Sequence, residues 1–193
     1  MGRPRSSVFG IGINDVNYVI RPTISGKQEK CQFYSTWVRM IERCYSEKWQ
    51  KRNRSYVGCT VCDEWLYFSK FKAWMEKQDW KGKQLDKDLL VFGNKVYSPE
   101  TCVFISIAAN SFMTDCLSSR GDLPIGVSWH KRDRKMQSSC HNPLTNKREF
   151  LGYFDCKYKA YKAWRKRKHE IACILSGLES DEKAIKALRT RYL

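Results

Sequence analysis

Hydrophobic residues recur at helical spacing in two segments of the first half of the chain. Between Gln32 and Ser46, large apolar side chains including Trp37 and Ile41 fall on one face, with charged residues on the other. A second stripe, rich in Trp and Phe, runs from Asp63 to Lys77. We expect two amphipathic helices that pack through these aromatic side chains. Residues 1–30, with Gly, Pro and Asn at short intervals, are expected to form an irregular leader.

Extended patterns alternate with these helices. Tyr56–Cys62 and Gln84–Phe92 are apolar and short, and Thr101–Ser106 is rich in β-branched and aromatic residues. Gly93-Asn94 marks a turn between the last two runs. Ala108–Leu117 is then expected to be a helix.

The pattern changes after a polar segment at residues 118–122. Gly126–Trp129, Met136–His141 and Glu149–Phe154 alternate polar and apolar positions and are separated by Lys/Arg-rich or Asn/Pro-rich turns. This predicts a three-stranded antiparallel meander. A basic helix over Lys157–Ile174 and a short helix over Asp181–Leu193 are expected to follow.

These elements predict an α+β protein with two folded parts. The expected division is 1–30 as leader, 31–117 as a helical and ββα domain, 118–125 as linker, 126–175 as a sheet-and-helix domain, and 176–193 as a helical tail.

The net charge of the chain indicates which kinds of molecule it binds. Lys and Arg number 36 against 20 acidic residues, giving a formal net charge of +16 and a pI near 9.5. Residues 118–193 carry +10 of this charge, and the segment Lys48–Ser55 is a further basic stretch. Phosphate-rich nucleic acid is the partner that this charge favours. With no apolar run of transmembrane length and no signal sequence, we expect a cytoplasmic protein that does not enter membranes.

The nine cysteines are scattered and odd in number, which is typical of reduced thiols. Cys59 and Cys62 have zinc-knuckle spacing, and Cys31, Cys44 or Cys102 could complete a set of ligands in space. A second Cys-x-x-Cys pair is missing, so the sequence favours buried core thiols over structural Zn²⁺.

Residues 85–110 read LDKDLLVFGNKVYSPETCVFISIAAN. This stretch resembles the ββα-metal core of phage HNH endonucleases, with a Gly-Asn-Lys turn, a Pro-Glu loop, a strand and a helix. The resemblance implies a phage protein in the host cytoplasm that hydrolyses DNA phosphodiester bonds with Mg²⁺ or Mn²⁺. By position, Asn110 would be a metal ligand, Asp86 and Asp88 would supply carboxylates from one face of a strand, and Lys87 would be the base.

The stretch departs from that family because it contains no His where the general base belongs. His130, His141 and His169 all lie beyond the linker, and the two acids flanking Lys87 would keep it protonated. Two readings therefore remain open: a metal-dependent endonuclease, or a degenerate nuclease that acts as a DNA-binding regulator or a protein inhibitor. For Asn94, turn conformation alone is a sufficient explanation.

Residues 126–170 contain Gly-Val at the first strand, a basic run before the second, and Leu-Gly-Tyr-Phe in the third. They resemble the Apetala-two/ethylene-response-factor DNA-binding domain, whose sheet lies in the major groove of double-stranded DNA. The residues that this resemblance and the local charge assign to DNA are Trp129, Lys131, Arg132, Arg134, Lys135, Gln137, Lys147, Arg148, Arg165 and Lys166. Leu151, Tyr153 and Phe154 are expected to pack the sheet against the helix. An RNA-binding basic protein is a third reading.

Overall fold

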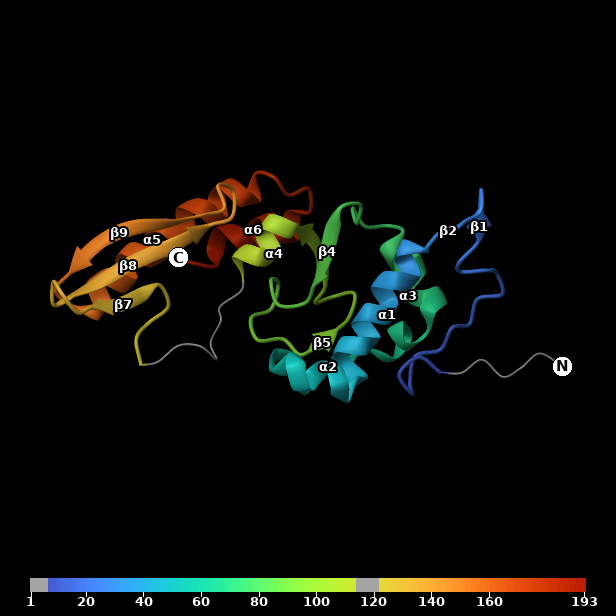
Figure 1. Ribbon diagram of the computed structural model, residues 1–193. Coiled ribbons are helices and arrows are strands. Elements are labelled where there is room, and N and C mark those ends of the chain that lie inside the picture. Colours follow the sequence, from blue (N-terminus) through green and yellow to red (C-terminus); the bar gives the residue numbers. More distant parts are fainter. Residues whose placement is uncertain (1–6, 114–121) are drawn as a thin grey trace. The chain divides into compact units, whose positions relative to one another are not determined.

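Two structural units divide the chain in the computed structural model, which describes residues 7–113 and 122–193 (Figure 1). Unit 1 comprises the residues up to Lys81 together with Leu85–Phe104. Unit 2 comprises Gly82–Gln84 and the residues from Ile105 onward. The fold is mixed α+β, as expected, but the chain passes into unit 2 earlier than the expected linker at 118–125. Residues 118–121 and the end of the helix predicted to reach Leu117 lie outside the described residues.

Unit 1 is mainly helical. Its helical elements are α1 (Gln32–Tyr45), α2 (Glu47–Arg52), η1 (Arg54–Tyr56), η2 (Asp63–Leu66) and α3 (Phe68–Met75). The predicted first helix is confirmed. The prediction of one continuous helix over Asp63–Lys77 was wrong, because the backbone of Tyr67 is extended and separates η2 from α3. There the Ile13 N–H donates to the Leu66 carbonyl at 2.8 Å and the Phe68 N–H donates to the Ile13 carbonyl at 3.0 Å, so the leader separates η2 from α3.

The strands of the first half are short. They are β1 (Thr23–Ile24), β2 (Lys27–Gln28), β3 (Thr60–Val61), β4 (Lys83–Asp86), β5 (Val96–Tyr97) and β6 (Val103–Ser106). β1 pairs with β2, β3 runs parallel to β5, and β4 pairs with β6. The extended run predicted over Gln84–Phe92 ends at Asp86, where the chain turns.

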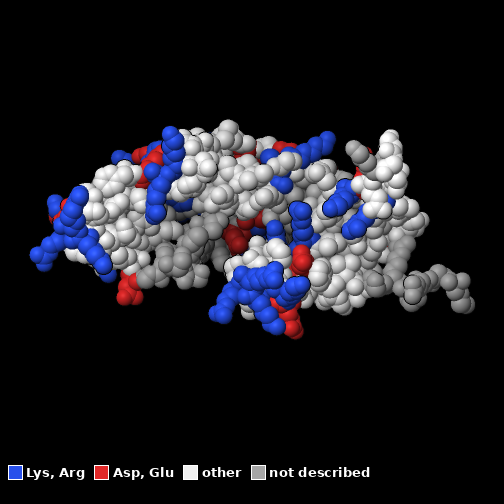
Figure 2. All heavy atoms as spheres, viewed as in Figure 1, with Lys and Arg blue, Asp and Glu red and all other residues white. Residues whose placement is uncertain are grey.

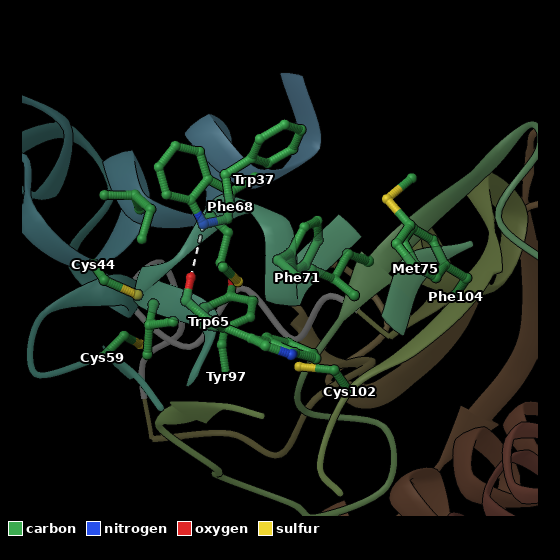
Figure 3. Close-up of a cluster of buried hydrophobic side chains, with 14 of the residues drawn as sticks. Trp37, Cys44, Cys59, Trp65, Phe68, Phe71, Met75, Tyr97, Cys102 and Phe104 are labelled. Atoms are coloured by element: carbon green, nitrogen blue, oxygen red, sulfur yellow. Dashed lines mark hydrogen bonds between the residues drawn. The ribbon is translucent and has the colours of Figure 1, made fainter. Parts of the chain in front are cut away.

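Aromatic packing holds unit 1 together, as the periodicity predicted (Figure 3). Trp37, Phe68 and Phe71 have no exposed surface, and Trp65 and Tyr97 are 1% exposed. The Trp37 indole N–H donates to the Trp65 carbonyl at 2.7 Å, which satisfies a donor that burial would otherwise leave without water.

Unit 2 contains the predicted meander. Its strands are β7 (Val127–His130), β8 (Lys135–Asn142) and β9 (Lys147–Phe154), paired antiparallel in the order β7-β8-β9. Its helices are α4 (Ile107–Phe112), α5 (Lys157–Ser176) and α6 (Glu182–Thr190). Asp181 caps α6 by accepting the Ala184 N–H at 2.9 Å, consistent with the predicted helix start.

Helix α5 is fixed against the sheet by two contacts. Arg167 of α5 donates from Nε to Glu149 of β9 at 2.6 Å, and the Trp164 ring lies against the backbone of Gly126, just before β7. Within residues 7–113 and 122–193, no helix is long and apolar enough to cross a membrane.

Candidate nucleic-acid interface

The two faces of the β7–β9 sheet differ in what covers them. Register places Met136, Ser138, Cys140 and Asn142 on one side of β8, and the last three are buried. Glu149 of β9 pairs with Cys140, and its carboxylate accepts a hydrogen bond from Arg167 of α5. This face therefore carries the contact with the helix.

The opposite side of the sheet, here called the open face, carries the remaining strand residues. Its members, by register, are Ser128, His130, Lys135, Gln137, Ser139, His141, Arg148, Phe150 and Tyr153. Six of these nine residues are exposed, whereas Ser139 is buried. The open face is thus a mixed surface of basic, aromatic and imidazole side chains.

A β-bulge determines which aromatic side chains reach the open face. Ser138 pairs with Gly152 whereas Ser139 pairs with Phe150, so Leu151 is an extra residue in β9. As a result Phe150 and Tyr153 lie on the same face although they are three residues apart. The expectation that Tyr153 packs against the helix was wrong, because simple alternation does not anticipate the bulge.

Aromatic rings cluster at this position. Tyr153 lies 5.0 Å from the ring of His130 and 5.1 Å from that of Phe150, measured between ring centroids. Phe150 is 55% exposed and Tyr153 is 40% exposed. Exposed aromatic rings that cluster on one face of a sheet are typical of a binding surface.

Arg148 lies on the open face beside this cluster. Its Nε donates to the Ser139 hydroxyl at 2.9 Å. No acidic partner of Arg148 is present among the described residues. The serine thereby holds the guanidinium in place while its terminal nitrogens remain available to a ligand.

The turn Lys131–Arg134, here called the basic turn, joins β7 to β8 at the end of the open face. Arg132 Nε donates to Asp133 Oδ1 at 3.1 Å, and Asp133 Oδ2 lies 3.2 Å from His130 Nδ1. Lys131 and Arg134 have no ion pair within the part of the chain that the structure describes. Exposed cations of this kind are typical phosphate ligands.

The structure separates the residues predicted to contact DNA into four groups. Lys135, Gln137 and Arg148 lie on the open face, and Lys131, Arg132 and Arg134 lie in the basic turn. Trp129 and Lys147, by contrast, lie on the helix side of the sheet, opposite Met136 and Asn142. Arg165 and Lys166 are exposed on α5, with the Arg165 Nε donating to the Tyr192 carbonyl at 3.0 Å, so neither shares the open face. The sequence did not indicate the other six open-face residues, which are Ser128, His130, Ser139, His141, Phe150 and Tyr153.

In unit 1, the Asp86 side chain caps the turn that follows β4. Its Oδ1 accepts the backbone N–H groups of Asp88 at 2.8 Å and Leu89 at 2.6 Å, and burial raises the pKa of its carboxyl. This local capping is the reason that the strand ends at Asp86.

Lys87 and Asn94 hold the same loop closed. Lys87 is 5% exposed, and its Nζ donates to Asp88 Oδ1 at 2.6 Å and to the Asn94 carbonyl at 2.9 Å. The Asn94 amide donates to the carbonyls of Lys87 and Val96 and accepts the Val96 N–H. The Lys87 amine is therefore buried and directed at two acceptors of its own loop.

Asn110 lies in α4 of unit 2, where its amide donates to the Gln84 side chain. Asp86 and Asp88 belong to unit 1. No group of three or more His, Cys, Asp or Glu side chains that could hold a metal ion occurs among residues 7–113 and 122–193.

The cysteines of the zinc-knuckle pair occupy different surroundings. Cys59 is 2% exposed beside Cys44, and burial raises the pKa of the Cys44 thiol to about 12 (Figure 3). Cys62 is only partly buried. Cys44, Cys59 and Cys102 are members of the aromatic core.

Comparison of the chain with protein-family models, with curated proteins and with solved structures gave no significant match. The class that the fold defines is an α+β protein with a three-stranded antiparallel sheet covered by helix on one face.

Proposed function

We propose that the chain binds double-stranded DNA through the open face of the β7–β9 sheet. The observation that carries this proposal is a sheet face, not covered by any described helix of unit 2, that presents Arg148 and Lys135 together with the exposed rings of Phe150 and Tyr153. Arg can bond two acceptors of guanine in the major groove, and an apolar ring can contact the thymine methyl group. The basic turn supplies phosphate contacts at one end of the face.

Duplex DNA fits this surface better than duplex RNA. A narrow β-sheet can enter the wide major groove of B-form DNA, whereas the major groove of A-form RNA is too deep and narrow for side chains to read. Exposed aromatic rings also stack on unpaired bases, which is the basis of the RNA-binding alternative. Competition between matched duplex DNA, duplex RNA and single strands at one salt concentration separates these alternatives.

The proposal does not include hydrolysis of DNA by the motif at residues 85–110. The groups that its resemblance to HNH endonucleases would use already have other partners: Asp86 caps a turn, and the Lys87 amine bonds Asp88 and Asn94. These contacts support the reading of unit 1 as a degenerate nuclease core within a DNA-binding protein.

Substitution of Arg148 tests the binding proposal. Arg148→Gln removes the charge and the bidentate donor while keeping a polar side chain next to Ser139, and we expect duplex affinity to fall about tenfold or more. Lys166→Gln is the matched control, because it removes one exposed charge from α5. Fluorescence anisotropy with a labelled duplex measures both. Equal affinities for the two variants would contradict the proposal.

A further inference from the structure

Unit 1 carries a basic surface that the sheet proposal does not use. Four exposed cations of α2 and η1 form it, here called the α2 basic surface: Lys48, Lys51, Arg52 and Arg54. In Figure 2, Lys and Arg side chains gather where Figure 1 draws α2. Lys48, Lys51 and Arg52 are spaced i, i+3 and i+4, so they lie on one side of the helix.

Hydrogen bonds to backbone groups hold α2 and η1 in place. Gln50 donates from Nε2 to the Cys44 carbonyl at 2.7 Å and to the Arg43 carbonyl at 3.2 Å, which ties α2 to the end of α1. Ser46 caps α2 by accepting the Trp49 N–H at 3.3 Å. The Lys95 amine donates to the Ser55 carbonyl at 2.7 Å and fixes η1. The four cations are therefore presented by an anchored element.

The charge of this surface is not neutralised within the described part of the chain. None of the four cations makes an ion pair with Asp or Glu there, whereas Arg132, Lys135 and Arg167 of unit 2 all do. Two of the four cations, Lys51 and Arg54, line a surface hollow of about 580 Å³ together with Glu47, Gln50 and Val57. Glu47 is the one acidic residue in that lining. Four like charges so close together repel one another, and an anionic partner would relieve that repulsion.

We infer that the α2 basic surface is a second contact for DNA, made with the phosphodiester backbone. The inference rests on the proposed function, since it adds a unit 1 contact to binding by the sheet. The ligand is a phosphate row rather than bases, because the exposed side chains are long cations and the one exposed apolar residue in the hollow's lining is Val57.

A four-residue charge variant tests the inference in the full chain. We would compare Lys48→Gln/Lys51→Gln/Arg52→Gln/Arg54→Gln with Lys30→Gln/Lys70→Gln/Lys77→Gln/Lys81→Gln, which removes the same charge from other exposed positions of the first half. The probe is a labelled duplex of about three helical turns, titrated over a salt series. We expect the first variant to lose about tenfold or more in affinity and to lower the slope of log K against log salt by about 3.6, since each of the four phosphate contacts contributes about 0.9.

The control variant should keep the wild-type slope, and Glu47→Gln should bind somewhat more tightly because it removes a carboxylate from the surface. Circular dichroism verifies that each variant is folded. If the two four-residue variants bind alike while Arg148→Gln is weakened, the inference fails and the proposed function stands. If the wild-type protein does not bind duplex DNA, the inference and the proposed function both fail. A weakened α2 variant with unaffected Arg148→Gln would support the second contact and refute the placement of the first.

Discussion

At the residue scale, single side chains decide which surface of the sheet meets solvent. Leu151, inserted by the bulge, brings Phe150 and Tyr153 to the same face. Ser139 positions Arg148 by one hydrogen bond. Neither feature follows from hydrophobic alternation, since a bulge shifts the alternation by one residue without a distinct composition. The cationic members Lys135 and Arg148 could be named from the sequence because charge is visible there, whereas Tyr153 could not.

Gly126 offers a prediction of stability at this scale. Its φ is +76°, and an added Cβ would lie 1.9 Å from the Trp164 ring. Gly126→Ala should therefore lower the free energy of unfolding by about 3 kcal/mol through strain and displacement of the ring. Gly82→Ala is the control, because Gly82 has a φ of +72° with open space around it. Chemical denaturation measures both, and equal losses would show that backbone conformation alone explains the effect.

At the element scale, long periodic segments were predicted well and short ones poorly. Helix α1, the three strands of the meander and helix α5 lie close to their predicted bounds. The failures have local causes. Backbone bonds from Ile13 interrupt the helix expected over Asp63–Lys77, and the Asp86 carboxylate ends a strand expected to reach Phe92. Both depend on partners that a periodicity argument does not include.

The contact between β9 and α5 predicts a pH dependence of stability. Hydrogen bonds from Arg167 and then Asn142 lower the pKa of Glu149 to about 2 from an ordinary value of 4.5. A lowered pKa in the folded state means that the contribution is complete above about pH 5 and is lost as the pH falls from about 4.5 to 2. Glu149→Gln should therefore cost about 1 kcal/mol at pH 7, because the pair is only partly buried, and the difference from wild type should shrink through that window.

Urea unfolding at a series of pH values measures this effect. Asp155→Asn serves as the control, since Asp155 is highly exposed and lies 3.9 Å from Lys135. A difference between wild type and Glu149→Gln that stays constant from pH 7 to 2 would contradict the role assigned to the ion pair.

At the scale of the whole molecule, charge, fold and surface support one account, in which a basic protein binds duplex DNA. The net charge of +16 supplies affinity for any polyphosphate, and the open face adds shape and side chains suited to the major groove. The residues 85–110 motif indicated a metal-dependent nuclease from the sequence. In the structure, the Asp86 carboxylate accepts the Leu89 N–H and the Asn110 amide donates to Gln84, contacts that no spacing argument could foresee.

This account predicts that the purified protein leaves supercoiled plasmid intact with Mg²⁺ or Mn²⁺ at salt concentrations where it binds. The physical reason is that Asp86 and Lys87 are engaged in their own loop, so the motif lacks an available general base. Agarose electrophoresis over a metal series measures the outcome. Metal-dependent nicking that disappears in Asn110→Ala would restore the endonuclease reading.

Site-specific photo-crosslinking tests the central claim most directly. A benzophenone amino acid at position 150 replaces Phe150, which is 55% exposed on the open face, and a second variant carries it at position 178 in place of Leu178, 61% exposed between α5 and α6. On irradiation with a labelled duplex, we predict a covalent protein–DNA product from position 150 and little from position 178. Equal crosslinking at both positions, or crosslinking at 178 alone, would contradict binding through the open face of the sheet.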